Sequence, residues 1–350
     1  MTVLTRRRCP RFAPTDHIRA TAAPVADAAG RGRVVVGWCG HVAVAHTSRS
    51  SLPIASFTAL ATFAQGASSE FPSFSRSLHR MSKLTKQAEA DHREACRLVD
   101  LRRELSEEEK DFVRTHWQES AQRTSQCRDR AFFTPPELAS AFTMYVIGSR
   151  VIDLGAGIGA LAFACHRALW FAHRFEGLPP PDIVCVERNP EYVRVGLRVL
   201  PEAVWICEDL LRVPRMRLRA FDTAIANPPY GPVPRSVNAP GYRGPRFEYH
   251  TIAVAAQVAD RGVFLIPQQS APFTYSGRSH MRFGTGDAEY TRFSASTGIR
   301  LQPTCGVDSA HYARQWRHQP PRTELVLTDF TAPTVLRQPR DPHIFGQQTG

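Results

Sequence analysis

The chain has 350 residues, of which 43% are hydrophobic, and this is enough apolar surface to build the cores of one or two domains. Its eight cysteines show no CxxC pairing, and no apolar stretch near the front is long enough to cross a bilayer. We therefore expect no metal site, no disulfide framework and no membrane span, and we predict a soluble, cytoplasmic protein.

The formal net charge of +12 suggests a polyanionic partner, because clustered basic side chains bind phosphates. The charge is unevenly placed, since residues 1–80 hold ten arginines against three acids and only +5 remains for residues 81–350. Charge alone therefore gives modest support for nucleic-acid binding, and the motifs must decide.

Residues 1–80 are rich in Arg, Ser, Ala and Pro and show neither helical nor strand periodicity. We predict that they form an unstructured leader and that the native start is Met81, where a helical pattern begins. An organellar transit peptide is the competing interpretation, because such peptides are also rich in arginine and poor in acids.

Three parts are predicted after the leader: a helical extension over 81–126, a main domain over 127–330 and a flexible tail over 331–350. Ser106 followed by Glu109 is a capping-box signature for the second helix of the extension. The main domain alternates apolar strands with amphipathic helices, which predicts an α/β fold with a doubly wound, Rossmann-like sheet of seven strands. The strands are predicted at 150–154, 182–187, 203–207, 222–227, 262–267, 299–305 and 323–330. Helices are predicted at 159–172, 190–200, 247–259 and 288–297.

The sequence DLGAGIG follows the first predicted strand and begins at Asp153. Gly155 and Gly157 permit a tight turn whose backbone can approach a ligand closely. Because Ala160 fits the last position of a GxGxxG/A pattern, a dinucleotide oxidoreductase is a competing interpretation. Asp153 argues against it, because an acid just before the glycines suits an ammonium group better than a pyrophosphate.

Two further acids follow the next two predicted strands. Glu187 lies thirty residues beyond Gly157, where a carboxylate can accept both hydroxyl groups of a ribose. Asp209 follows the third strand and can accept a hydrogen bond from an adenine amino group. Acids after three successive strands predict a nucleotide-type cofactor at the carboxyl edge of the sheet.

Asn227, Pro228, Pro229 and Tyr230 follow the fourth strand. The side-chain oxygen of Asn227 and the carbonyl of Pro228 can hold the two N–H bonds of an exocyclic amine, and Pro229 fixes the backbone of that turn. Tyr230 can stack on a base that has left its strand. Hydride transfer needs none of these groups, so this motif favours chemistry on an amine.

The segment AFFTPPELASAF precedes the first strand, and its Thr134 and Glu137 form a second capping-box signature. One interpretation places Phe132, Phe133 and Thr134 against the cofactor. The alternative is a well-capped helix that buries its aromatic side chains.

With TPPEL, DLGAGIG, Glu187, Asp209 and NPPY in this order, residues 132–330 resemble the amino-methyltransferases, and especially the adenine-N6 DNA methyltransferases. The resemblance implies a class I methyltransferase sheet, S-adenosyl-L-methionine as cofactor, and methyl transfer to the N6 amine of adenine in nucleic acid, with DNA favoured over RNA. It implies that the target amine is held by Asn227, Pro228, Pro229 and Tyr230. It implies cofactor contacts by Phe133, Thr134, Asp153, Gly155, Gly157, Glu187, Asp209 and Asn227.

The restriction-type members of that family carry a long target-recognition domain, whereas only 120 residues follow Tyr230 here. Recognition is therefore expected from short loops, from the 81–126 helices or from a specificity partner. The loops 231–247, 268–282 and 311–318 interleave basic and aromatic side chains, which suits a nucleic-acid groove.

Other methyl acceptors remain open at this point. RNA adenine-N6 methylation needs the same pocket, and the protein glutamine N5-methyltransferases also use an NPPY motif. N4-cytosine methylation is a further alternative, although its enzymes more often have Ser in place of Asn227.

Overall fold

The computed structural model describes residues 85–118, 133–316 and 322–331, together with the backbone of three two-residue strands nearer the N-terminus. Met81, Phe132 and most of the predicted leader and tail lie outside these residues. The boundaries of the leader, the helical extension and the tail stay predictions.

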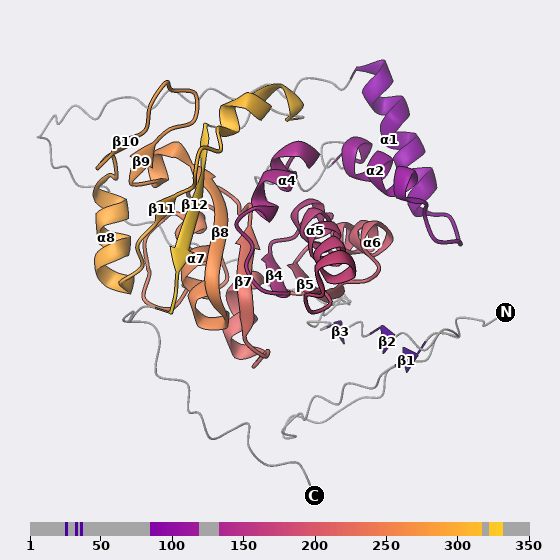
Figure 1. The fold of residues 1–350 in the computed structure, drawn as a ribbon, viewed down its shortest axis with the longest axis horizontal. Coiled ribbons are helices and arrows are strands. Elements are labelled where there is room, and N and C mark those ends of the chain that lie inside the picture. Colours follow the sequence, from indigo (N-terminus) through magenta and orange to yellow (C-terminus); the bar gives the residue numbers. More distant parts are fainter. Residues whose placement is uncertain are drawn as a thin grey trace, which may run out of the picture.

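A single large sheet organises the fold (Figure 1), with the strand order β11-β12-β8-β7-β4-β5-β6-β3. Neighbouring strands from β8 to β6 pair parallel, whereas β12 runs antiparallel to both β8 and β11. Seven of the eight strands are those predicted from the sequence, so the predicted α/β class with a doubly wound sheet is confirmed. The strands are β3 (Val36–Gly37), β4 (Arg150–Leu154), β5 (Asp182–Glu187), β6 (Val204–Cys207), β7 (Phe221–Ala226), β8 (Ala259–Pro267), β11 (Gln302–Pro303) and β12 (Thr323–Asp329). A separate pair is formed by β1 (Val25–Ala26) and β2 (Gly32–Arg33).

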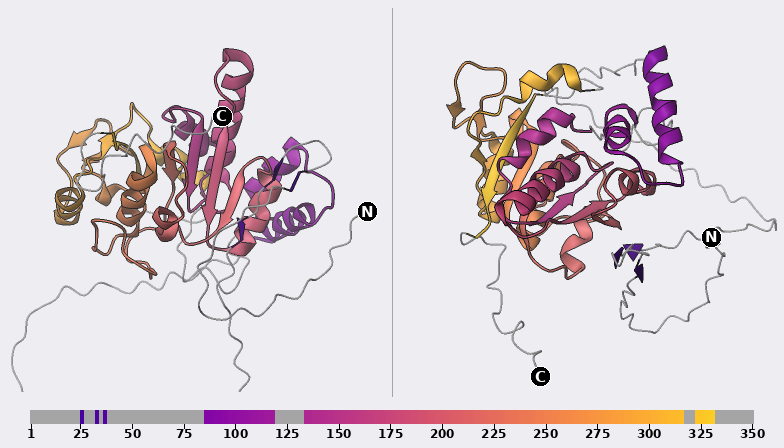
Figure 2. Two further views of the ribbon diagram at one scale, coloured as in Figure 1. Left: turned by 90° about the horizontal axis from the view of Figure 1, so that it is seen from below. Right: turned by 45° about the vertical axis from the view of Figure 1, so that its right-hand side comes forward.

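Alternate side chains of each central strand enter two different cores, as expected for a sheet covered on both faces. On β5, Ile183 and Cys185 join the core under α4, α5 and α6, whereas Val184 and Val186 join the core under η2, α7 and α8. Figure 2 shows these two helical layers on opposite sides of the sheet. The covering helices are α4 (Pro136–Thr143), α5 (Ala160–Glu176), α6 (Pro190–Val199), η2 (Leu210–Arg215), α7 (Phe247–Val258), α8 (Ala288–Thr297) and η4 (Ser309–Gln315).

Two helices precede the sheet domain, α1 (Lys86–Val99) and α2 (Glu107–His116). The predicted capping box is confirmed, because the Ser106 hydroxyl accepts from the Glu109 N–H and the Glu109 carboxylate accepts from the Ser106 N–H. Trp117, which ends α2, packs edge-on against the ring of Tyr192 on α6 at 5.7 Å between centroids. The helical extension therefore packs directly beside the carboxyl edge of the sheet.

No helix among the described residues is both long and apolar enough to cross a bilayer. The predicted strand over 299–305 is much shorter than expected, because only β11 pairs within it. Pro303 has no N–H to donate to a ladder, and the side chains of Ile299 and Leu301 are buried in the core beside α8 instead.

The segment between β8 and α8 contains a feature that hydrophobic periodicity did not predict. A short helix, η3 (Gln268–Ser270), leads into a hairpin of β9 (Phe273–Thr274) and β10 (Arg282–Phe283). Each of these strands has two residues, which is too short for an alternating pattern to be recognised.

Candidate active site

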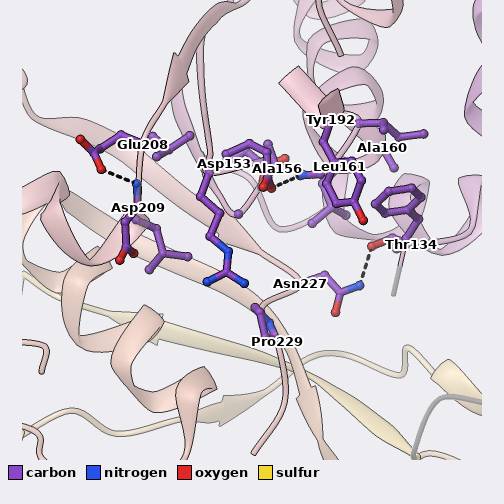
Figure 3. Close-up of a pocket in the computed structure, with 18 of the residues that line it drawn as sticks. Thr134, Asp153, Ala156, Ala160, Leu161, Tyr192, Glu208, Asp209, Asn227 and Pro229 are labelled. Carbon is purple, nitrogen blue, oxygen red and sulfur yellow. Dashed lines mark hydrogen bonds between the residues drawn. The ribbon is translucent and has the colours of Figure 1, made fainter. Parts of the chain in front are cut away.

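A cleft of about 790 Å³, which includes its mouth to solvent, lies at the carboxyl ends of β4, β5, β6 and β7. Figure 3 shows Glu208 and Asp209 on one side of the cleft, Thr134 and Tyr192 on the other, and Asn227 with Pro229 between them. Every predicted site residue except Pro228 and Tyr230 lines it, namely Phe133, Thr134, Asp153, Gly155, Gly157, Glu187, Asp209, Asn227 and Pro229.

The glycine-rich turn needs its glycines for backbone conformation as well as for space. Gly155, Gly157 and Gly159 all have positive φ, at 80°, 57° and 88°. A Cβ on Gly157 would lie 3.0 Å from the ring of Phe133. At Gly155 and Gly157 the turn therefore presents its backbone to the cleft.

Glu187 holds this turn in place. Its Oε2 accepts from the Gly157 N–H at 2.9 Å, and its Oε1 accepts from the Asn189 N–H at 2.8 Å. Burial raises the pKa of Glu187 to about 7, although these backbone donors oppose the shift. One carboxylate thus joins the glycine turn to the start of α6 while it lines the cleft.

Asp153 is 1% exposed, and only one of its oxygens is satisfied within the described residues. Oδ2 accepts from the Ala162 N–H in the first turn of α5 at 3.2 Å, whereas Oδ1 has no partner among the residues that the structure describes. Burial, with a smaller contribution from the charge of Glu187, raises the pKa of Asp153 to about 8. A buried carboxylate oxygen without a donor is costly, so the cleft is prepared for a cationic or hydrogen-bond-donating ligand group.

Asp209 caps η2, because its Oδ1 accepts from the Leu211 N–H at 2.9 Å. Its Oδ2 accepts from the Ser236 hydroxyl at 2.5 Å and so fastens the loop after β7 to the wall of the cleft. Glu208 lines the same wall, and its Oε1 accepts from the Asp209 N–H at 2.8 Å. The sequence predicted Asp209 alone of this adjacent pair as a cofactor contact, but both acids line the cleft.

The carboxamide of Asn227 is oriented from both ends. Its Nδ2 donates to the Thr134 hydroxyl at 3.0 Å, and its Oδ1 accepts from the Tyr230 hydroxyl at 2.5 Å. The predicted capping box of Thr134 and Glu137 is wrong, because α4 begins after Pro135 and has no side-chain cap. The Thr134 hydroxyl instead links the start of α4 to the end of β7.

Two of the predicted pocket residues do not line the cleft. Tyr230 is 5% exposed and Pro228 is buried as well. The chain turns at Gly231, which has φ of 69°, and the Tyr230 hydroxyl donates to Asn227. Stacking of Tyr230 on a base stays a prediction.

Glu248 supports this turn and was missed from the sequence. It is fully buried on α7 and accepts from the Gly231 N–H and the Ser270 hydroxyl, both at 2.8 Å. Burial raises its pKa. The available signal was its position as the only acid in the apolar helix of residues 247–259.

The loops predicted to contact nucleic acid are partly built into the core. Tyr242, Phe273 and Trp316 are buried, so these three aromatic side chains are not available for stacking. His250 holds the first loop, because its Nδ1 accepts from the Ala239 N–H and its Nε2–H donates to the Gly244 carbonyl. The basic residues of these loops that stay exposed are Arg243, Arg278, His280, Arg282, His311 and Arg314. Positions 317 and 318 lie outside the described residues.

No group of three or more His, Cys, Asp or Glu side chains within the described ranges could hold a metal ion.

No protein-family model matches the chain, and no curated protein matches it. Among solved structures, it is similar to a modification subunit assigned to a type I restriction enzyme of Vibrio vulnificus YJ016, with 15% identity and a TM-score of 0.45 over 66% of this chain and 51% of that one. A type I restriction-modification methyltransferase subunit of Streptococcus thermophilus has 12% identity and a TM-score of 0.41, over 63% of this chain and 49% of that one. Magnesium protoporphyrin IX methyltransferase of Synechocystis PCC 6803 has 13% identity and a TM-score of 0.35, over 71% of this chain and 99% of that one.

This chain spans about half the length of the two modification subunits. Because the TM-scores are below 0.5 and the identities are 15% or lower, we assign the function from the geometry of the site.

Replacement of Gly157 by Ala tests the glycine turn. We expect Gly157→Ala to lower the free energy of unfolding by more than the roughly 1 kcal/mol that a left-handed backbone costs a non-glycine residue, because its Cβ also meets Phe133. Gly177→Ala is the matched control, since Gly177 has φ of 73° but open space around it. If urea unfolding showed that Gly157→Ala and Gly177→Ala lower the free energy of unfolding equally, the contact with Phe133 would be unimportant.

The buried carboxyl of Asp153 predicts a pH dependence of stability. Its pKa rises from 3.8 to about 8 on folding, so the folded state binds the proton more tightly and stability falls as the pH rises from about 4 toward 8. We expect the melting temperature of the ligand-free protein to fall less steeply over this interval in Asp153→Asn than in the wild type. Glu187 acts in the same direction in both proteins, so parallel curves would contradict the assignment.

Proposed function

We propose that the protein is an S-adenosyl-L-methionine-dependent methyltransferase that methylates the exocyclic N6 amine of adenine in nucleic acid. The observation that carries the proposal is the Asn227 carboxamide, which is oriented in the cleft by Thr134 and Tyr230. An exocyclic amine is a weak nucleophile because its lone pair is delocalised into the ring. Its chemistry therefore requires an acceptor held in a fixed position beside the methyl donor.

The residues of the cleft fit S-adenosyl-L-methionine group by group. The ammonium group can donate to Oδ1 of Asp153, which is otherwise unsatisfied within the described residues. The ribose hydroxyls can donate to Glu187, and the adenine amino group can donate to Glu208 or Asp209. When bound, the cofactor supplies a methyl group that its sulfonium centre has already activated.

Asn227 and Pro228 would hold the target amine. A carboxamide oxygen can accept two hydrogen bonds, so Asn227 can keep the Tyr230 hydroxyl and also receive one N–H of the amine. The carbonyl of Pro228 can receive the other N–H, and Pro229 restricts the backbone of this turn. Catalysis by these groups is alignment and preorganised electrostatics.

Nucleic acid is the favoured substrate class because residues 81–350 carry a net charge of +5 and the loops 231–247, 268–282 and 311–318 expose arginines. DNA is preferred over RNA on the resemblance of the motifs. About half of the described chain after Tyr230 forms the rest of the sheet and its helices, so recognition falls to short loops, to the helices over 81–126 or to a specificity partner.

Asn227→Ala tests the proposed function. We expect methyl transfer to fall by about a hundredfold or more, because the acceptor for the amine is lost, while S-adenosyl-L-methionine still binds. Transfer of label from S-adenosyl-L-methionine to duplex DNA, single-stranded DNA, ribosomal RNA and a protein extract is measured with the full chain, and labelled products are digested. N6-methyladenine in the wild-type product supports the proposal, and label confined to glutamine would overturn the substrate.

Gln302→Ala is the control for that experiment, since Gln302 is an exposed carboxamide on the edge strand β11 and does not line the cleft. It should leave turnover unchanged. Full activity of Asn227→Ala would contradict the pocket assignment.

Tyr230→Phe separates the two roles considered for Tyr230. The variant keeps the ring and loses the hydrogen bond to Asn227, so we expect about a fivefold to tenfold lower turnover if the hydroxyl orients the carboxamide. Steady-state methyl transfer measures the effect. A role through stacking alone predicts wild-type turnover for Tyr230→Phe and a large loss for Tyr230→Ala.

A further inference from the structure

The β9–β10 hairpin presents an unusual surface. Phe283 pairs in register with Phe273, but the two side chains have opposite environments. Phe273 is 2% exposed and belongs to the core, whereas Phe283 is 71% exposed. Phe283 has the largest exposed fraction among the large hydrophobic side chains of the described residues.

The hairpin also exposes positive charge. Residues 274–286 contain Arg278, His280 and Arg282 and no acid, and all three side chains are exposed. Neither arginine forms an ion pair with any residue that the structure describes. An exposed aromatic ring with cations beside it matches the surface of proteins that bind single-stranded nucleic acid by stacking and phosphate contacts.

The base of the hairpin is held firmly by Glu324 on β12, which is buried. Its Oε1 accepts from the N–H groups of Tyr275 and Ser276 at 2.8 and 3.0 Å, and its Oε2 accepts from the Ser276 hydroxyl at 3.0 Å. The Gln268 side chain donates to the same carboxylate at 2.6 Å. Because this base is already ordered, little conformational entropy is lost when the hairpin binds a partner.

The hairpin lies at the same edge of the sheet as the proposed target pocket. It follows β8, which is parallel to β7, so it belongs to the same carboxyl edge as Asn227, and Figure 1 shows it beyond the end of β8. Glu248 bonds both the turn at Gly231 and Ser270 just before the hairpin. Arg246, at the start of α7, pairs with Asp287 just after the hairpin. Both ends of the segment are thus tied to the elements that position Asn227.

We propose that this hairpin is a nucleic-acid contact, in which Phe283 stacks on a base near the target and Arg278 and Arg282 bind phosphates. The proposal deepens the proposed function and rests on its substrate class. The ring of Tyr230 is buried in this structure, and Phe283 offers an exposed aromatic ring from an element outside the cleft. Phe283 lies one residue beyond the loop that the sequence singled out.

Phe283→Ala tests the stacking contact. Binding of the full chain to fluorescein-labelled single-stranded and duplex oligonucleotides is measured by anisotropy at several potassium chloride concentrations. We expect about tenfold weaker binding with an unchanged dependence on salt, because a neutral contact is lost. Phe175→Ala is the matched control, since Phe175 is 67% exposed near the end of α5, at the opposite edge of the sheet, and should bind as the wild type does.

The double variant Arg278→Ser, Arg282→Ser tests the phosphate contacts. The slope of log K against log salt should become shallower by about 1.4 on single strands and about 1.8 on duplex, because two counterion-releasing contacts are lost. Arg217→Ser with Arg219→Ser is the control, because both arginines are exposed just before β7 begins, away from the cleft. That control should leave the slope near the wild-type value.

Methyl transfer by the same proteins separates the two proposals. If the wild type methylates adenine and both hairpin variants bind and react as it does, the hairpin proposal fails and the proposed function stands. If the wild type binds oligonucleotides through the hairpin but methylates no base, the proposed function fails and the hairpin proposal stands. Absence of oligonucleotide binding by the wild type overturns the hairpin proposal, and a surface for a protein partner is then the remaining interpretation. Unchanged melting temperatures confirm that these variants are folded.

Discussion

The hydrogen bond from the Gly157 N–H to the Glu187 carboxylate is the contact on which the candidate site depends. The same arrangement, in which a buried carboxylate accepts backbone N–H groups of a neighbouring loop, occurs twice more at the carboxyl edge of the sheet. Glu248 does this for the turn at Gly231, and Glu324 does it for the base of the hairpin. Loops that would otherwise be mobile are thereby fixed relative to one another, which a site that works by alignment requires.

Burial of these carboxylates disfavours their charged form and therefore raises their pKa values. Burial raises the pKa of Glu187 to about 7 and also raises that of Glu248, even though each accepts two hydrogen bonds. Asp153 differs because one of its oxygens has no partner within the described residues. Glu248 therefore serves the architecture, and Glu187 does so while it also lines the cleft, whereas one oxygen of Asp153 stays unsatisfied within the described residues.

The proposed chemistry divides between two kinds of surface. The cleft holds polar groups with fixed geometry, and Asn227 is oriented there by partners from α4 and from its own turn. The hairpin is outside the cleft and offers an exposed ring and cations, which suit a flexible polymer more than a small molecule. Arg246 and Glu248 of α7 connect the two surfaces. Arg246 pairs with Asp287 after the hairpin, and Glu248 bonds both Ser270 before the hairpin and the turn at Gly231 that follows Asn227.

The sequence by itself determined the central strands, the helix over 288–297 and the positions of Asp153 and Glu187, because strand periodicity is local and the carboxyl ends of parallel strands must meet at one edge. Only the tertiary structure decided that Thr134 bonds Asn227, that Tyr230 is buried, and which aromatic side chains of the loops stay exposed. These outcomes depend on contacts between residues far apart in the chain, and no local pattern records which neighbour a side chain will meet. The hairpin could not be predicted for the same reason, because the carboxylate that fixes its base belongs to Glu324 on β12, far along the chain.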